Sequence, residues 1–153
     1  MKRRAVVDAR GDRLFVSSWS TTEYGATVQD DWIEVAGEPV PDAVLGGLVR
    51  SALANSRTGI PHPDYSSGPT PAVRKLWKLA NVRSESAFER GTHALYVKYE
   101  DSTPDLVVMP YRNGGRRSGF TEMLDQAIIL DARADDVMLG TAVRRALGIA
   151  SEA

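Results

Sequence analysis

Two ten-residue stretches of this chain align without a gap: Val44-Leu-Gly-Gly-Leu-Val-Arg-Ser-Ala-Leu53 and Met138-Leu-Gly-Thr-Ala-Val-Arg-Arg-Ala-Leu147. Six of the ten aligned positions are identical, namely Leu45/Leu139, Gly46/Gly140, Val49/Val143, Arg50/Arg144, Ala52/Ala146 and Leu53/Leu147. In both stretches apolar residues recur at helical spacing, which predicts two helices that each bury one face. A repeat whose flanking segments also correspond indicates an internal duplication, and so predicts one domain built from two related units.

The same series of β-like runs precedes each predicted helix. The runs cover residues 5–10, 13–19 and 32–36 in the first half of the chain, and residues 93–100, 105–111 and 127–131 in the second. Polar loops at 20–30 and 112–119 occupy the same place in the two series. We therefore predict an α+β fold, in which a mainly antiparallel sheet carries packed helices. We expect residues 1–153 to form a single domain with an internal duplication of a β-β-β-α unit, at about 5–56 and 93–149, joined by a central helical segment.

Glycine and proline positions refine this picture. Five of these residues interrupt 57–70, which predicts a long loop, and Thr70 then caps a helix that starts at Pro71. Pro110 predicts an edge strand or a strand end, because proline cannot donate a backbone hydrogen bond. Glycine weakens an isolated helix, so the recurrence of Gly46 as Gly140 predicts that both helices pack closely on the sheet.

The composition excludes several classes of protein. The 153 residues carry a net charge of −1, which provides no general attraction to nucleic acid or to a membrane surface. No apolar run approaches the roughly 20 residues that a membrane-spanning helix needs. The absence of cysteine excludes disulfides and thiolate chemistry and suits a reducing compartment. We expect a cytoplasmic globular protein that binds neither membranes nor, directly, nucleic acid.

The sequence offers no catalytic or metal-binding set. His62 and His93 are the only histidines, whereas a zinc site needs about four convergent ligands. Asp64 is placed to orient His62 as a base, but no nucleophile motif accompanies them, which favours a solvated loop histidine. The carboxylate pairs at 30–31 and 135–136 suit a solvated face and a helix cap. We predict a protein that is not an enzyme, with no catalytic residue, metal or cofactor.

The loop Arg112-Asn-Gly-Gly-Arg-Arg-Ser-Gly119 is the stretch most suggestive of a ligand. Its glycines expose backbone N–H groups, and its three arginines have the charge to clamp a phosphate or a carboxylate. The loop matches neither the phosphate-binding loop nor the dinucleotide fingerprint, and a flexible connection that carries solubilising charge is the favoured interpretation. An alternative function stays open: a small enzyme or phosphate-ligand-binding protein that uses this loop.

Four motifs are distributed along the chain: Leu45-Gly46…Val49…Ala52-Leu53…Ser56, Leu76-Trp-Lys-Leu-Ala-Asn-Val82…Phe88, Val108-Met-Pro110…Asn113-Gly-Gly115…Gly119-Phe120 and the second Leu139-Gly140. Together they resemble the immunity proteins of bacterial contact-dependent growth inhibition (CDI) systems, the CdiI family. The resemblance covers the chain from about Ser17 to Leu147. It implies a protein that binds the C-terminal toxin domain delivered by a neighbouring cell, one-to-one, and neutralises it. Such toxins are often nucleases, including ones that cleave transfer RNA.

The residues that match the family look structural, so the toxin-contacting surface has to be inferred from charge and aromatic content. A nuclease carries a basic groove for RNA, and an inhibitor that fills it presents acidic and aromatic side chains. We expect these to come from two loops and to be Glu23, Tyr24, Asp30, Asp31, Asp64 and Tyr65. A second candidate surface, suited to an acidic patch on the toxin, consists of Arg112, Asn113, Arg116 and Arg117.

Overall fold

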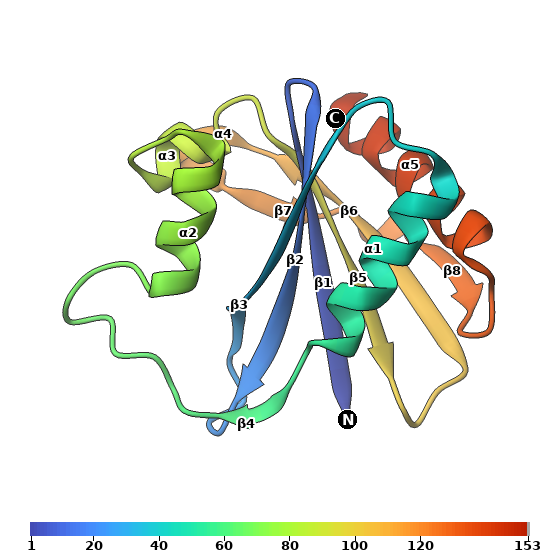
Figure 1. Cartoon of the computed structure of the whole chain (residues 1–153), viewed down its shortest axis with the longest axis horizontal. Helices are drawn as coiled ribbons and strands as arrows, with labels where there is room; N and C mark the ends of the chain where they lie inside the picture. Colours follow the sequence, from blue (N-terminus) through green and yellow to red (C-terminus); the bar gives the residue numbers. More distant parts are fainter. Residues whose placement is uncertain (153) are drawn as a thin grey trace.

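The computed structural model of the protein shows an eight-stranded sheet with helices on both faces (Figure 1). The structure describes residues 1–152, apart from the side chains of Arg116 and Arg117. The strands are β1 (Lys2–Arg10), β2 (Arg13–Thr22), β3 (Thr27–Gly37), β4 (Thr58–Ile60), β5 (His93–Glu100), β6 (Asp105–Asn113), β7 (Phe120–Glu122) and β8 (Ile128–Asp131). The helices are α1 (Asp42–Ala54), α2 (Pro71–Ala80), α3 (Glu85–Glu89), α4 (Gly115–Ser118) and α5 (Asp136–Glu152), with a 3₁₀ turn at Leu124–Gln126. The predicted α+β class is confirmed.

The strand order places the first strands of the two halves side by side at the centre of the sheet. The order is β3-β2-β1-β5-β6-β7, with β4 beside β2 and β8 beside β6. β1 pairs antiparallel with β2 and with β5, so that Val6 lies between Ser17 and Tyr96. In the described part of the chain every pairing is antiparallel except β2 with β4. This arrangement about the β1–β5 pair supports the proposed duplication.

The two faces of the sheet pack against different helices. Successive residues of a strand point to opposite faces, so Val16 belongs to the core beneath α1 and α5, whereas Phe15 packs with Leu76 and Phe88 of α2 and α3. Figure 1 shows α1 and α5 on the right of the sheet and α2 and α3 on the left. The larger core lies on the α1–α5 side and includes Ala5, Val7, Leu14, Val16, Leu45, Val49, Leu95, Val97, Leu139 and Val143.

Gly46 and Gly140 allow α1 and α5 to cross in close contact. A Cβ atom built at Gly46 would lie 1.9 Å from the carbonyl oxygen of Asp136, and one built at Gly140 would lie 1.8 Å from that of Asp42. The prediction that these glycines pack on the sheet is therefore wrong: each packs on the first turn of the other helix. Two ion pairs join the same segments, Arg50 Nε to Asp136 at 2.9 Å and Arg144 Nε to Asp42 at 3.3 Å. These reciprocal contacts also support the proposed duplication.

Residues 20–30, predicted to be a loop, mostly extend the strands on either side. β2 continues to Thr22 and β3 begins at Thr27, so only a tight turn separates them. Gly25 in this turn has a φ of 86°, which glycine adopts without the steric cost of a Cβ atom. Polar residues of this stretch stay within the strands because their side chains are hydrogen-bonded inside the sheet, as Ser20 is to Asp30. This brings the tip of the β2–β3 hairpin to one end of the sheet.

Pro110 lies inside β6, which has neighbours on both sides, so the predicted edge or strand end is wrong. On one side β8 pairs with β6 as far as Val108, and β7 pairs with β6 from Tyr111 onwards. Pro110 occupies the interval between these partners, where the missing N–H breaks no ladder bond. The third strand predicted for the second half, at 127–131, is observed as β8, and β7 is a further short strand that the sequence does not predict.

Candidate functional site

Three exposed rings meet at one end of the sheet, where the β2–β3 turn approaches the segment after β4. The ring centroid of His62 lies 5.6 Å from that of Tyr24 and 5.9 Å from that of Tyr65. Tyr24 is 79% exposed and Tyr65 is 54% exposed, although both make these contacts. The sequence predicts both tyrosines as contact residues but treats His62 as a solvated loop residue. We call Tyr24, His62 and Tyr65 the aromatic tip.

Backbone hydrogen bonds hold the β2–β3 hairpin, which carries Tyr24, against the segment that leads to His62 and Tyr65. The N–H of Thr21 donates to the carbonyl oxygen of Arg57 (2.9 Å), and the N–H of Glu23 donates to that of Ile60 (2.8 Å). These bonds add β4 to the sheet beside β2, within the stretch that the sequence predicts as an irregular loop. The imidazole Nδ1 of His62 then lies 3.5 Å from the hydroxyl of Thr22. The aromatic tip is thus built on the sheet itself.

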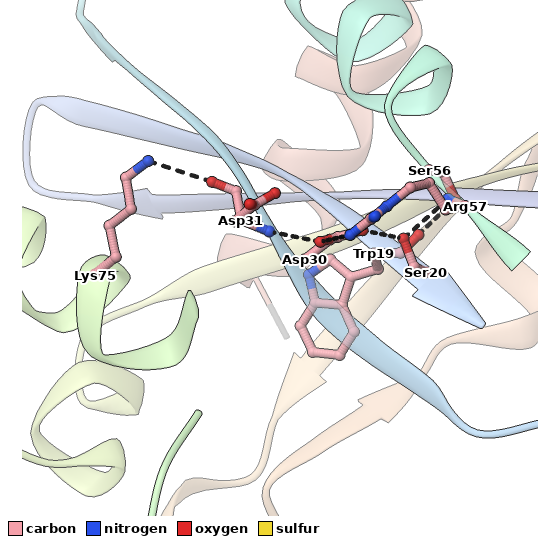
Figure 2. Close-up of polar contacts among 7 residues, drawn as sticks. All are labelled: Trp19, Ser20, Asp30, Asp31, Ser56, Arg57 and Lys75. Atoms are coloured by element: carbon pink, nitrogen blue, oxygen red, sulfur yellow. Dashed lines mark hydrogen bonds and ion pairs between the residues drawn. The ribbon is translucent and has the colours of Figure 1, made fainter. Parts of the chain in front are cut away.

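A buried carboxylate anchors this end of the sheet (Figure 2). Asp30 accepts hydrogen bonds from Arg57 Nε and Nη2 at 2.9 and 2.7 Å, from Ser20 Oγ at 2.5 Å and from the N–H of Asp31 at 2.9 Å. Burial raises the pKa of Asp30, but these hydrogen bonds outweigh it and hold the pKa at about 2. Ser56, part of the family-like motif, donates to the carbonyl oxygen of Trp19. These contacts fix the chain between α1 and β4.

Asp30 therefore differs from the other acidic residues predicted to contact a partner. It lies within β3 with 7% of its surface exposed, and its carboxylate is already bound by Arg57, which corrects its expected place in a solvated loop. Asp31, Glu23 and Asp64 are exposed. The Ser66 side chain and N–H, both bonded to Asp64, lower the pKa of that carboxyl group. The structure thus leaves three of the four predicted carboxylates available at the surface.

The arginine–glycine segment is ordered by Asn113 and does not form an open loop. Asn113 Nδ2 donates to the carbonyl oxygens of Glu89 and Thr92 at 2.7 and 2.8 Å, and its Oδ1 accepts from the N–H of Gly115. Both polar atoms of this side chain thus form hydrogen bonds within the protein, which makes Asn113 a structural residue of this segment. Arg112 is exposed, whereas the side chains of Arg116 and Arg117 lie outside the part of the chain that the structure describes.

Within residues 1–152, leaving out those two arginine side chains, no three His, Asp or Glu side chains are grouped closely enough to hold a metal ion. Over the same described residues, no helix has both the length and the apolar character needed to span a membrane. The exposed end of the sheet carries the three rings of the aromatic tip, with the exposed carboxylates of Glu23 and Asp64 next to Tyr24 and Tyr65 in the sequence. Tyrosine combines a large apolar face with a hydroxyl group, and is for that reason enriched at the centres of protein interfaces.

Comparisons with known proteins identify the family and the fold of this chain. The family model of the CDI immunity proteins, CdiI, matches residues 3–150, so the chain belongs to this family. A protein of unknown function from Neisseria meningitidis has a similar structure, with a TM-score of 0.77 at 19% identity, covering 97% of this chain and 95% of that one. The CdiA-CT/CdiI toxin and immunity complex from Yersinia pseudotuberculosis is also similar, with a TM-score of 0.74 at 19% identity and 97% of each chain covered. No curated protein matches the sequence.

Proposed function

We propose that this protein binds and neutralises one cognate toxin, the C-terminal domain of a CDI effector, in a one-to-one complex. Membership of the CdiI family is the observation that carries this proposal. A structural neighbour described as a toxin and immunity complex supports it. The protein acts by association alone and needs neither a cofactor nor a catalytic group of its own.

The aromatic tip and the carboxylates beside it form the toxin-binding surface in this proposal. Tyr24 and Tyr65 are large, exposed and held by a neighbouring ring, so they lose little conformational freedom on binding. Glu23, Asp31 and Asp64 add exposed negative charge. Asp30 acts indirectly, because it fixes Arg57 and the segment that leads to the tip.

The toxin in this proposal is a nuclease, such as one that cleaves transfer RNA, and the immunity protein covers its substrate groove. A groove that binds RNA carries positive charge, which complements a surface of carboxylates and tyrosine hydroxyl groups. The contacts of Asn113 weigh against the alternative, a phosphate-ligand site in the arginine–glycine loop, because its side chain is used internally. We therefore place the aromatic tip at the interface and keep Arg112 as a comparison site.

Substitutions at the aromatic tip test this proposal. We expect the cognate toxin domain to be encoded immediately upstream of this protein. Tyr24→Ala and Tyr65→Ala should each weaken binding to that domain by at least about tenfold, as interface anchors do. Leu124→Ala is the matched control, because Leu124 is 70% exposed but belongs to the 3₁₀ turn beyond β7. His62→Phe keeps a ring between the tyrosines but removes all proton chemistry, and should preserve both binding and protection. If the tyrosine variants bind like Leu124→Ala, this surface is not the interface.

A further inference from the structure

A pocket lies on the sheet face that carries α2 and α3, away from the aromatic tip residues. Its volume is about 410 Å³. Residues of β1, β2, β3, β5 and β6 contribute to its lining, α2 and α3 bound it on one side, and Phe120 of β7 contributes from the other. The two helices cover only part of this face, because their core residues pack over Phe15 and Ile33 of β2 and β3. The remainder of the face is left open as the pocket.

Two polar side chains in the pocket, Asp8 and Gln29, are more than nine-tenths buried. Asp8 is 6% exposed and, among the described residues, its carboxylate forms neither an ion pair nor a hydrogen bond. Gln29 is 8% exposed, and its Nε2 has no hydrogen-bond partner within the same described residues. A buried polar group without a partner costs free energy, which a bound group of complementary chemistry can recover. Both side chains line the same cavity.

Aromatic rings form much of the remaining wall. Tyr111 and Phe120 line the pocket with their centroids 5.7 Å apart, and Tyr96, which is buried and outside the lining, lies next to Tyr111 with its centroid 5.4 Å away. Trp19 and Phe88 also line the pocket. Aromatic faces attract cations, and Arg4 already shows this chemistry with its guanidinium carbon 4.2 Å above the ring of Tyr96.

The cations near Asp8 form no ion pair with it among the described residues. Arg4 lines the pocket with its guanidinium group over the ring of Tyr96, and Arg10, outside the lining, donates to the carbonyl oxygens of Phe88 and Arg90 and to the hydroxyl of Thr92. Glu85 adds a second carboxylate to the lining and accepts a hydrogen bond from Trp77 Nε1 at 3.1 Å. The pocket therefore holds two carboxyl groups, Asp8 and Glu85, beside aromatic rings, and neither forms an ion pair with another described residue.

We propose that this pocket receives a basic side chain, lysine or arginine, of the cognate toxin domain, with Asp8 and Glu85 as its charge partners and the rings of Trp19, Tyr111 and Phe120 around its stem. The inference rests on the proposed function, since it names the chemistry by which the same partner is held at a second point. A lysine or arginine stem is apolar and its end is charged, which matches a pocket with aromatic walls and a buried acid.

The state of Asp8 makes this contact dependent on pH. Burial raises the pKa of Asp8 to about 7, with a further contribution from Glu85 and an opposing one from Arg10. The other titratable or charged groups around it are Arg4 on β1, Tyr96 on β5 and Tyr111 on β6, whereas α2 contributes only apolar residues to the pocket. A cation that enters favours the ionised carboxylate, so binding should release a proton near neutral pH and tighten as the pH rises from 6 to 8.

Binding measurements on pocket variants test the inference. The probe is the toxin domain encoded immediately upstream, and its Kd is measured at pH 6, 7 and 8 for wild type, Asp8→Asn, Glu85→Gln and the exposed control Asp125→Asn. Asp8→Asn should weaken binding at pH 8 by at least about tenfold, chiefly through faster dissociation, and should reduce the pH dependence. Titrating groups of the toxin are common to all variants, so the difference from wild type isolates Asp8.

The outcomes separate this inference from the proposed function. If Asp8→Asn binds with the affinity and pH profile of wild type while Tyr24→Ala is weakened, the pocket does not hold a basic side chain and the immunity role stands. If wild type itself does not bind the toxin domain, both proposals are wrong. Thermal unfolding of Asp8→Asn provides the folding control, because removal of a buried charge should not unfold the protein.

Discussion

The guanidinium group of Arg57 donates to both carboxylate oxygens of Asp30, at 2.9 and 2.7 Å, across 27 residues of sequence. The Asp30 side chain is 8% exposed, whereas that of Arg57 is 60% exposed. The pair therefore closes the segment after α1 over the β2–β3 hairpin, next to β4. The position of the aromatic tip depends on this contact between a buried acid and a surface base.

Asp30→Ala should lower the free energy of unfolding by about 1–3 kcal/mol, because it leaves Ser20 and Arg57 without their acceptor. The contribution of Asp30 is present above its unfolded-state pKa of roughly 3.9 and is lost as the pH falls through the folded-state value of about 2. Urea denaturation at pH 7 and at pH 2.5 measures both effects. Asp31→Ala is the control and should change stability by less than about 0.5 kcal/mol, because that carboxylate is exposed. Equal losses for the two variants would contradict the anchoring role.

Gly46→Ala should destabilise the protein by about 1–3 kcal/mol or more, although alanine is the better helix former. The new methyl group would lie 1.9 Å from the carbonyl oxygen of Asp136, and α1 and α5 would have to separate. Gly148→Ala is the matched control on α5, where nothing lies within 4 Å of the added atom, and it should be neutral or stabilising. Thermal unfolding distinguishes them, and a stabilised Gly46→Ala would mean that the helices do not cross in this way.

Much of the fold follows from local patterns in the sequence. The two similar helices, the strand alternation and the Thr70 cap of α2 all depend on neighbouring residues, and Thr70 does accept from the N–H of Val73. The contact between Gly46 and Asp136 joins segments about 90 residues apart, and the repeat alone does not reveal whether a glycine faces the sheet or another helix. Likewise, the sequence predicts Asp30 to be a loop residue, because the contact with Arg57 arises only when β4 joins the sheet beside β2.

The candidate site was predictable only in part, for the same reason. Tyr24 and Tyr65 stand in polar segments, which identifies them as exposed, but only the fold places His62 between them. The sequence indicates the pocket around Asp8 only weakly, because Asp8 is simply an acidic residue within the β-like run that begins at Ala5. That residue faces the side of the sheet opposite to Val7, and its burial depends on α3, which lies far along the chain.

Asp8→Asn should stabilise the free protein at pH 8 relative to wild type, by about 2–4 kcal/mol more than it does at pH 4. The folded-state pKa of about 7 lies above the unfolded value, so the stability associated with protonated Asp8 is present at pH 4 and is lost as the pH rises through 7. Chemical denaturation across this range, with Asp125→Asn as the control, measures the difference. A difference between variant and wild type that does not change with pH would show that Asp8 titrates as an ordinary exposed acid.

Charge reversal at the tip should act mainly on the association rate. Glu23→Lys and Asp64→Lys should slow association with the toxin domain and weaken its dependence on salt, because exposed charges steer the encounter. Arg112→Glu, on the comparison surface, should change the rate less. Stopped-flow kinetics over a salt series decides between the surfaces. If Arg112→Glu abolishes binding and the tip variants do not, the arginine surface is the interface, although the immunity role stands.

Isothermal titration calorimetry of the purified protein with the toxin domain encoded immediately upstream tests the central claim most directly. We expect one-to-one binding with a Kd of about 1 nM, which corresponds to about −12 kcal/mol. The same complex should abolish the toxic activity in a mixture of equal amounts. The absence of binding between the folded partners, at concentrations of tens of micromolar, would contradict the proposal that this protein neutralises the toxin by association.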